Sequence, residues 1–261
     1  MSDVFHYYDG DLPLLVSVPH DGRRIPGDVS ERMTQTGCEI PDTDWHVAQL
    51  YDFVRDLGAK LLVAEYSRYV VDLNRSAQDD VLYPGQLVTG LCPEQTFAGE
   101  DIYVGDGVTA EEKERRIAKY WRPYHDHVRV TLTAMRDQHG YSLLWDAHSI
   151  PSLVPRLFDG ELAELNLGTN SGASCAAAIE SAVAGILRAS DYSSVVNDRF
   201  KGGFITPNYG RPDENIHALQ LEIAQRAYMD EASRTFDDKS AADLRDTLRQ
   251  MIHNLLEAAR A

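Results

Sequence analysis

Short apolar runs alternate along the chain with longer segments in which apolar residues recur at helical spacing. Three of the runs have the length and composition of buried strands, at residues 12–18, 60–65 and 141–149. Between the first two, residues 42–57 carry apolar side chains at helical spacing. A strand, a helix and a strand in this order predict a βαβ unit with parallel strands.

The helix expected over residues 42–57 has signals at both ends. Asp42 or Thr43 is suited to the N-cap position, and Gly58 is suited to end the helix. Asp44 is therefore expected in the first helical turn, close to the end of the first strand.

The rest of the chain continues the two patterns. Further extended runs are expected at residues 69–73, 193–196, 203–206 and 218–223, and further helices at about 109–138, 174–188 and 240–260. Thr109 and Glu112 form a capping box at the start of the longest helix. Pro123 predicts a kink or a break near Trp121, because proline cannot donate a helical hydrogen bond.

Residues 76–107 show little periodicity and are expected to form a long loop, of the kind that is functional or mobile in compact domains. Whether this loop acts as a lid is left open by the pattern. The chain contains no repeat and no linker-like shift in composition. We therefore expect a single α/β domain over residues 1–261, with a mixed, mostly parallel sheet flanked by helices.

Composition narrows the choice of partners. The formal net charge is -16, and such a field repels nucleic acids and anionic membranes, although clustered arginines could still hold a small anion. The three cysteines are widely spaced and unpaired by any CxxC motif, which fits a reducing compartment. Since neither a signal peptide nor a membrane span is visible, a cytoplasmic protein is expected. Oligomeric state is left open.

Two histidines stand where strands end. His20 follows the run at residues 12–18, and His148 closes the run at residues 141–149. Open α/β sheets place their sites at the carboxyl ends of their strands. A single histidine after a strand is more often a loop or capping residue, but the pair predicts one shared metal or catalytic site.

Two carboxylates could complete this site. Zinc hydrolases typically use three nitrogen or oxygen ligands, and Asp44 could follow His20 as the third, unless it is only a solvated first-turn aspartate. Glu222 is the candidate general base, since a carboxylate on a buried strand is costly unless it is paired or used. Alternation places Leu219 and Leu221 on one face of that strand and Gln220 and Glu222 on the other.

The same residues lie within six ordered sequence blocks. The blocks are PHDG at His20, DTDWH at Asp44, YSRYVVDLNR, WDAHS at His148, GGFITPNYG and HALQLEIAQRAYMD. Together, over about residues 14–230, they resemble the N-formylglutamate amidohydrolases (deformylases) of histidine degradation. The resemblance implies a fold similar to that of zinc carboxypeptidases. It also implies one Zn²⁺, or another divalent metal, held by His20, Asp44 and His148, with Glu222 as the base.

A substrate with two carboxylates and a formamide requires cations and amide donors. Arg68 and Arg75 are the first choices because arginine binds carboxylates bidentately, and Asn74 lies beside them. Arg156 and Asn208 are weaker candidates. For each arginine, solvation at the surface or a structural ion pair is an equally good explanation without the family resemblance.

His125 and His127 form a further histidine pair. Two residues apart on a helix, their side chains point in different directions, so joint metal binding would require a helix broken at Pro123. Packing, or a hydrogen bond from one of them in the site, is the favoured interpretation.

The resemblance thus implies zinc-dependent hydrolysis of N-formyl-L-glutamate to formate and L-glutamate, with this small anionic compound as the partner. One alternative keeps the metal chemistry but acts on another N-acyl amino acid or on a peptidoglycan-like amide. The other is a non-catalytic protein that binds an acidic amino-acid derivative.

Overall fold

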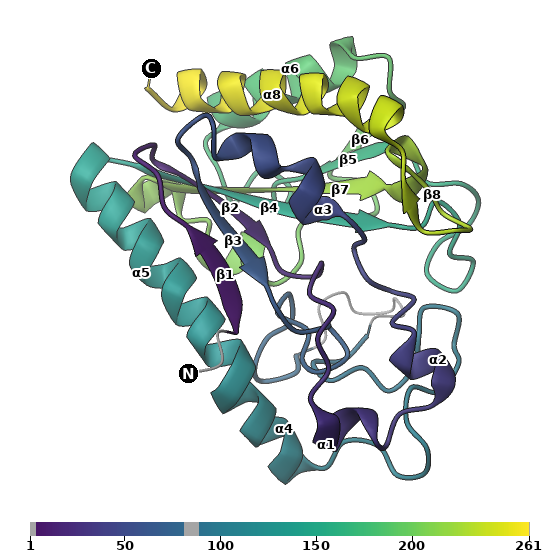
Figure 1. The fold of residues 1–261 in the computed structure, drawn as a ribbon. Coiled ribbons are helices and arrows are strands. Elements are labelled where there is room, and N and C mark those ends of the chain that lie inside the picture. Colours follow the sequence, from purple (N-terminus) through teal and green to yellow (C-terminus); the bar gives the residue numbers. More distant parts are fainter. Residues whose placement is uncertain (1–3, 81–88, 261) are drawn as a thin grey trace.

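The computed structural model describes residues 4–80 and 89–260, and Figure 1 shows a central sheet between two layers of helices. The strands are β1 (Phe5–Tyr8), β2 (Leu14–Val18), β3 (Lys60–Ala64), β4 (Ser142–Ile150), β5 (Leu165–Gly168), β6 (Ser194–Val196) and β7 (Ile216–Ala224). Their order in the sheet is β1-β3-β2-β4-β7-β5-β6. The four strands from β3 to β7 are parallel, whereas β1 and β5 are antiparallel to their inner neighbours. The expected mixed, mostly parallel sheet is confirmed.

Helices cover both faces of this sheet. The helices of the described residues are α1 (Gly27–Ser30), α2 (Gln35–Cys38), α3 (Val47–Leu50), α4 (Ala110–Arg116), α5 (Arg122–His139), α6 (Ala177–Ala189), α7 (Ile205–Tyr209) and α8 (Asp238–Arg260). The short turns are η1 (Asp52–Val54), η2 (Ile117–Trp121), η3 (Pro212–Glu214) and η4 (Gln225–Ala227), and a separate hairpin joins β8 (Met229–Asp230) to β9 (Thr235–Phe236). Helices α3, α6 and α8 lie on one face, and α5 crosses the other (Figure 1).

Each face of the sheet packs against its own apolar cluster. In β2, Leu14 and Val16 belong to the cluster under α6 and α8, whereas Leu15 belongs to the cluster under α5. Successive side chains of a strand point to opposite faces, so β2 must be apolar throughout to be buried on both sides. This requirement explains the uninterrupted apolar run that predicts the strand.

The long helical segment starts and bends where the sequence predicts. The Thr109 hydroxyl accepts a hydrogen bond from Glu112 N at 3.2 Å, and Gly140 ends the segment with a φ of 83°. Between α4 and α5, residues Ile117–Trp121 form a π-helical turn directly before Pro123. The irregularity expected near Trp121 is therefore a π turn within a continuous helical segment.

The prediction of a helix over residues 42–57 is wrong. Only α3 and η1 form there, and Asp44 lies before α3 in a turn. The N-cap is His46, whose φ of 64° is left-handed, so residues 42–45 cannot continue the helix backward. Asp44 N donates instead to His20 O at 3.1 Å, which ties this turn to the end of β2.

The prediction of extended runs at residues 69–73 and 203–206 is also wrong. Residues 69–73 form turns, and Arg116 donates hydrogen bonds to the carbonyls of Tyr69 and Val70 in place of a neighbouring strand. Residues 203–206 lead into α7. A side chain at Gly203 would overlap Asn74, so only glycine allows this close approach.

Two strands of the sheet, β1 at one edge and β5 between β7 and β6, are absent from the sequence-based expectations, and both are only four residues long. Of the predicted loop over residues 76–107, residues 81–88 lie outside the described part of the chain. No helix within residues 4–80 and 89–260 is both long and apolar enough to cross a membrane.

Candidate metal centre

The carboxyl ends of three adjacent strands bring the predicted site residues together. His20 follows β2, while His148 on β4 lies in register with Glu222 on β7. All three are at least nine-tenths buried. The polar residues that end apolar runs in the sequence therefore meet at one edge of the sheet.

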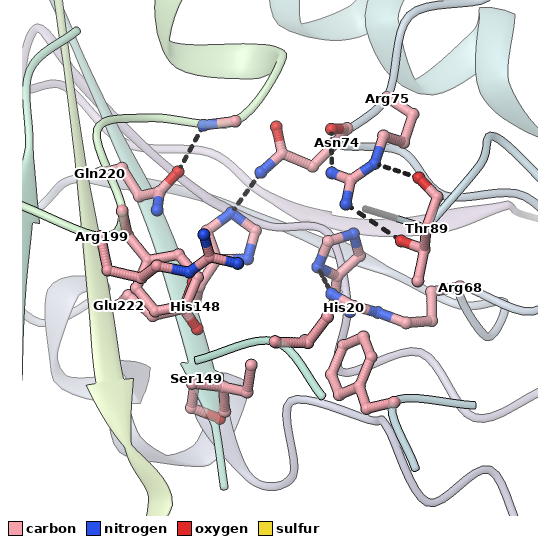
Figure 2. Close-up of a pocket in the computed structure, with 15 residues that line it drawn as sticks. His20, Arg68, Asn74, Arg75, Thr89, His148, Ser149, Arg199, Gln220 and Glu222 are labelled. Atoms are coloured by element: carbon pink, nitrogen blue, oxygen red, sulfur yellow. Dashed lines mark hydrogen bonds between the residues drawn. The ribbon is translucent and has the colours of Figure 1, made fainter. Parts of the chain in front are cut away.

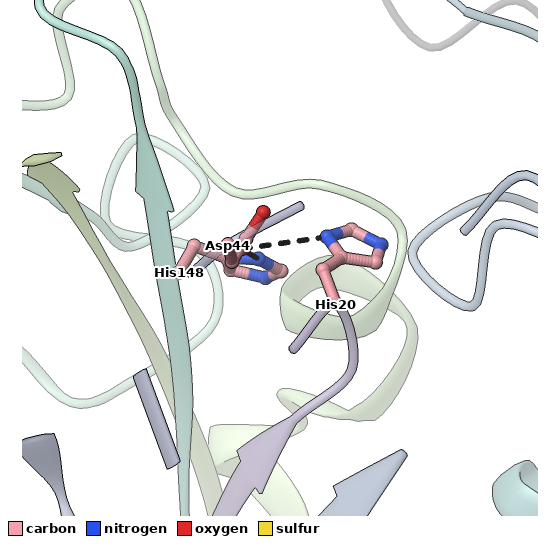
Figure 3. A group of neighbouring side chains, drawn as sticks. All are labelled: His20, Asp44 and His148. Atoms are coloured by element: carbon pink, nitrogen blue, oxygen red, sulfur yellow. Dashed lines mark hydrogen bonds and ion pairs between the residues drawn. The ribbon is translucent and has the colours of Figure 1, made fainter. Parts of the chain in front are cut away.

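His20, Asp44 and His148 form a compact set of donor atoms (Figure 3). One ligand atom from each residue lies within 4.8 Å of the other two. The Asp44 Oδ2 atom is 3.0 Å from His148 Nδ1 and 3.6 Å from His20 Nδ1, and it also accepts a hydrogen bond from Ser149 N. Two imidazoles and one carboxylate that converge in this way could bind a metal ion.

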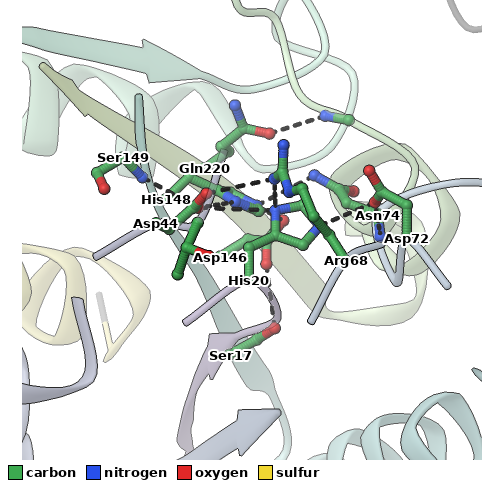
Figure 4. Close-up of polar contacts among 12 residues, drawn as sticks. Ser17, His20, Asp44, Arg68, Asp72, Asn74, Asp146, His148, Ser149 and Gln220 are labelled. Carbon is green, nitrogen blue, oxygen red and sulfur yellow. Dashed lines mark hydrogen bonds and ion pairs between the residues drawn. The ribbon is translucent and has the colours of Figure 1, made fainter. Parts of the chain in front are cut away.

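Two further aspartates orient the histidines from behind (Figure 4). Asp72 Oδ1 is 2.8 Å from His20 Nε2, and Asp146 Oδ2 is 2.9 Å from His148 Nε2. Histidines that bind metals usually donate their second ring N–H to a carboxylate, which leaves the first nitrogen free for the ion. The donor set therefore fits a metal on the Nδ1 side.

Sequence reasoning missed both of these aspartates. Asp146 had a signal, because it lies two residues before His148 and thus on the same face of β4. Asp72 had none, because its contact with His20 joins two segments that only the folded chain brings together.

At Asp44 and His148, neighbouring charges outweigh the effect of burial on the pKa. Burial alone would raise the pKa of Asp44, but the charge of Arg68 and the contacts with both histidines lower it. Burial would lower the pKa of His148, but Asp146 and Asp44 raise it well above its ordinary value. The site therefore attracts positive charge, and the Arg68 guanidinium lies directly against His20 Nδ1 and Asp44.

Glu222 differs from these aspartates. Burial raises its pKa to about 8, and Asp44 and Asp146 act in the same direction. Glu222 faces a cavity of about 90 Å³ that His20 and His148 also line (Figure 2). A carboxyl group with a pKa near neutrality, beside a metal-type donor set, is suited to take up and return a proton.

The cavity also contains three of the predicted substrate contacts. Arg68, Asn74 and Arg75 line it. Arg75 is held by Thr89, whose carbonyl accepts from Nε at 2.8 Å and whose hydroxyl accepts from Nη2 at 3.0 Å. Asn74 Nδ2 lies 3.0 Å from His148 Nε2.

The other two predicted contacts lie elsewhere. Arg156 donates to Thr96 O and to Gln95 Oε1, outside the lining of this cavity. Asn208 is exposed on α7. The structure brings in two lining residues that sequence reasoning did not single out as contacts, Arg199 and Gln220.

His125 and His127 do not belong to the donor set. His125 is buried, with Nδ1 2.8 Å from Tyr209 Oη and Nε2 2.9 Å from Leu73 O. His127 packs against the rings of Phe5 and Tyr7. The two side chains thus have separate packing roles, as favoured from their spacing.

Fold and site together define an α/β protein with a buried donor set for a metal at the carboxyl edge of its sheet. Residues 12–229 match the model of the N-formylglutamate amidohydrolase family, and the chain belongs to this family.

Proteins similar to this chain match it over nearly its whole length. N-formylglutamate deformylase of Pseudomonas putida is 47% identical, with 98% of this chain and 97% of that protein covered. The protein of the same name from Pseudomonas aeruginosa is 46% identical, with coverages of 99% and 96%. The crystal structure of N-formylglutamate amidohydrolase from Ralstonia eutropha JMP134 superposes with a TM-score of 0.82 at 27% identity, over 98% of this chain and 97% of that one. A protein from Agrobacterium tumefaciens shares the fold, with a TM-score of 0.75 at 16% identity and coverages of 98% and 94%.

Proposed function

We propose that this protein hydrolyses N-formyl-L-glutamate to formate and L-glutamate in a zinc-dependent reaction. The observation that carries the proposal is that His20, Asp44 and His148 form one buried donor set, and that Glu222 lines the same cavity as the two histidines. The two Pseudomonas relatives, which are named N-formylglutamate deformylase, support the choice of substrate.

Zinc suits the donor set, because two imidazole nitrogens and one carboxylate oxygen are common ligands of catalytic zinc. When bound, such an ion polarises a carbonyl group and lowers the pKa of a water molecule. His20 and His148 would hold it through Nδ1, and Asp44 through its carboxylate.

Glu222 would move the proton. As a carboxylate it accepts a proton from the attacking water while the water oxygen bonds to the formyl carbon. It then returns that proton to the amide nitrogen as the carbon–nitrogen bond breaks, so the amine leaves neutral together with formic acid, which gives up its proton to the amine or to water and becomes formate. Its raised pKa brings both protonation states within reach near neutral pH.

Arg68, Arg75 and Asn74 remain proposed substrate contacts, since all three line the cavity. Arg75 is the best placed, because its contacts with Thr89 hold the guanidinium in position. Among residues 4–80 and 89–260, no carboxylate forms an ion pair with it. Arg156 and Asn208 lie outside the lining of the cavity and are not proposed for this role.

The wider setting follows from the family resemblance. We propose one catalytic domain over residues 1–261 that acts in the cytoplasm on a small anionic substrate. Its reaction would be the last step of a histidine degradation route.

The test is formate release from N-formyl-L-glutamate, compared with N-acetyl-L-glutamate and N-formyl-L-aspartate. We expect release of formate and L-glutamate from the first substrate, with a kcat/KM well above the values for the other two. Preference for another acyl amino acid would overturn the substrate assignment. Tight binding of all three without turnover would favour a binding protein.

A further inference from the structure

We propose that Gln220 is a specificity-determining residue that donates a hydrogen bond to the γ-carboxylate of the substrate. This inference rests on the proposed function, because it concerns the side chain of the same substrate. Gln220 lies on β7, two residues before Glu222, and lines the same cavity.

The orientation of the Gln220 amide is set by the backbone. Gly203 N donates to Gln220 Oε1 at 2.8 Å (Figure 2). Because the oxygen accepts this bond, the NH₂ group must occupy the other end of the amide. The amide therefore presents a donor to the cavity.

This donor is available. Gln220 is 3% exposed as a residue and lines the cavity. Within residues 4–80 and 89–260, no group accepts a hydrogen bond from its Nε2. A carboxylate bound in the cavity would supply a charged acceptor for it.

The spacing suits the γ-carboxylate. Gln220 lies two residues before the proposed base Glu222, and two residues along a strand correspond to about 7 Å. An extended glutamate side chain spans roughly 5 Å from its nitrogen to the γ-carboxyl carbon, four single bonds away. The α-carboxylate is only two bonds from that nitrogen, so it stays close to the reacting amide.

The charge around Gln220 also suits an anion. Arg75 and Arg199 line the cavity with it, so a carboxylate there has cations nearby. The neighbour of Gln220 in the sheet register is Asp146, which is already hydrogen-bonded to Ser17. The charge of this buried acid is compensated by His148, whose Nε2 lies 2.9 Å from its Oδ2.

The experiment compares N-formyl-L-glutamate with N-formyl-L-glutamine in the metal-loaded wild type and in Gln220→Glu. The new carboxylate can still accept from Gly203 N, but it repels a γ-carboxylate and can accept from a γ-amide. We expect the ratio of kcat/KM, glutamate over glutamine derivative, to fall about 10- to 100-fold, as for the loss of a hydrogen bond to a charged group. Gln250→Glu on the exposed face of α8 makes the same chemical change and should leave the ratio as in the wild type.

Equal losses for both substrates, or an unchanged ratio, would overturn the inference. If Gln220→Glu does not fold, Gln220→Met removes the donor without adding charge. Its KM for N-formyl-L-glutamate should rise about tenfold or more, while that for N-formyl-L-norleucine, which lacks the γ-carboxylate, should not rise. A wild type that does not cleave N-formyl-L-glutamate would contradict the proposed function instead.

Discussion

The side chains of the nine-residue strand β7 alternate between two faces of the sheet, and the two faces have different surroundings. Leu219, Leu221 and Ile223 lie fully buried in the apolar cluster beneath α6 and α8. Gln220 and Glu222 alternate with them and line the cavity on the opposite face. One strand therefore carries core residues on one side and the proposed catalytic and specificity residues on the other, and mutations can test the two faces separately.

The cavity face is stabilised in a different way from the apolar face. Its aspartates are buried, but each has a histidine or an arginine within contact distance. Buried charges are costly without such partners, so the polar side gains little from burial itself. We expect substitutions on this face to change activity or metal affinity more than stability.

The largest expected effect is that of Glu222→Gln. Loss of the proton carrier should lower kcat by about 10²- to 10⁴-fold, the range of general acid–base catalysis. Zinc content, measured by metal analysis, and unfolding by urea should stay close to those of the wild type. A variant that turns over at a near-normal rate would remove Glu222 from the proposed role.

On the opposite face, Leu221→Ala should give the converse result. Removal of a fully buried leucine costs about 2–5 kcal/mol of unfolding free energy, measured by urea denaturation. The kcat of the folded fraction should be nearly unchanged, because this side chain does not line the cavity. If kcat fell strongly while stability held, the separation of the two faces would be wrong.

Asp146→Asn tests how far the cavity face depends on groups behind the donor set. The amide keeps the shape but weakens the contact with His148 Nε2, so zinc affinity should fall about 10- to 100-fold in competition with a chelator. Asp137→Asn, exposed at the end of α5, is the control and should bind zinc normally. Equal affinities would show that Asp146 does not orient His148.

The smallest expected effect concerns pH and His125, which lies buried on α5 against Tyr209 of α7. Burial lowers the pKa of His125 to about 3, against about 6.5 in the unfolded chain. Below about pH 6.5 the unfolded chain binds the extra proton, so stability is lost as pH falls from there toward 3. Between about pH 7.5 and 5 this group should account for about 2 kcal/mol of lost stability.

His125→Gln should remove this part of the pH dependence in urea denaturation. At about pH 7.5 the variant is expected to be the less stable protein, because it loses the contacts with Tyr209 and Leu73. An unchanged pH dependence would contradict a neutral, buried His125.

Much of the site was predictable from local patterns. His20 and His148 end apolar runs, and the alternation around Glu222 is confirmed by the structure. Strand ends in a parallel sheet meet at one edge, so the meeting of these residues follows from short stretches of sequence.

The remaining features depend on contacts between distant segments. The helix expected around Asp44 is wrong because a hydrogen bond to His20 and the left-handed His46 place Asp44 in a turn. Residue spacing does not show where a long side chain points, so Arg156 was predicted for the cavity and Arg199 was missed. Gln220 stands on the predicted face, but its orientation comes from Gly203, on a separate segment.

The central claim is that His20, Asp44 and His148 hold a metal required for hydrolysis. Its most direct test is formate release by chelator-treated protein during a titration with zinc. We expect no formate release without metal and full activity at one equivalent of zinc. In the His148→Ala variant, added zinc should not restore activity at any concentration. Full turnover by the metal-free protein, or normal zinc binding by His148→Ala, would contradict the claim.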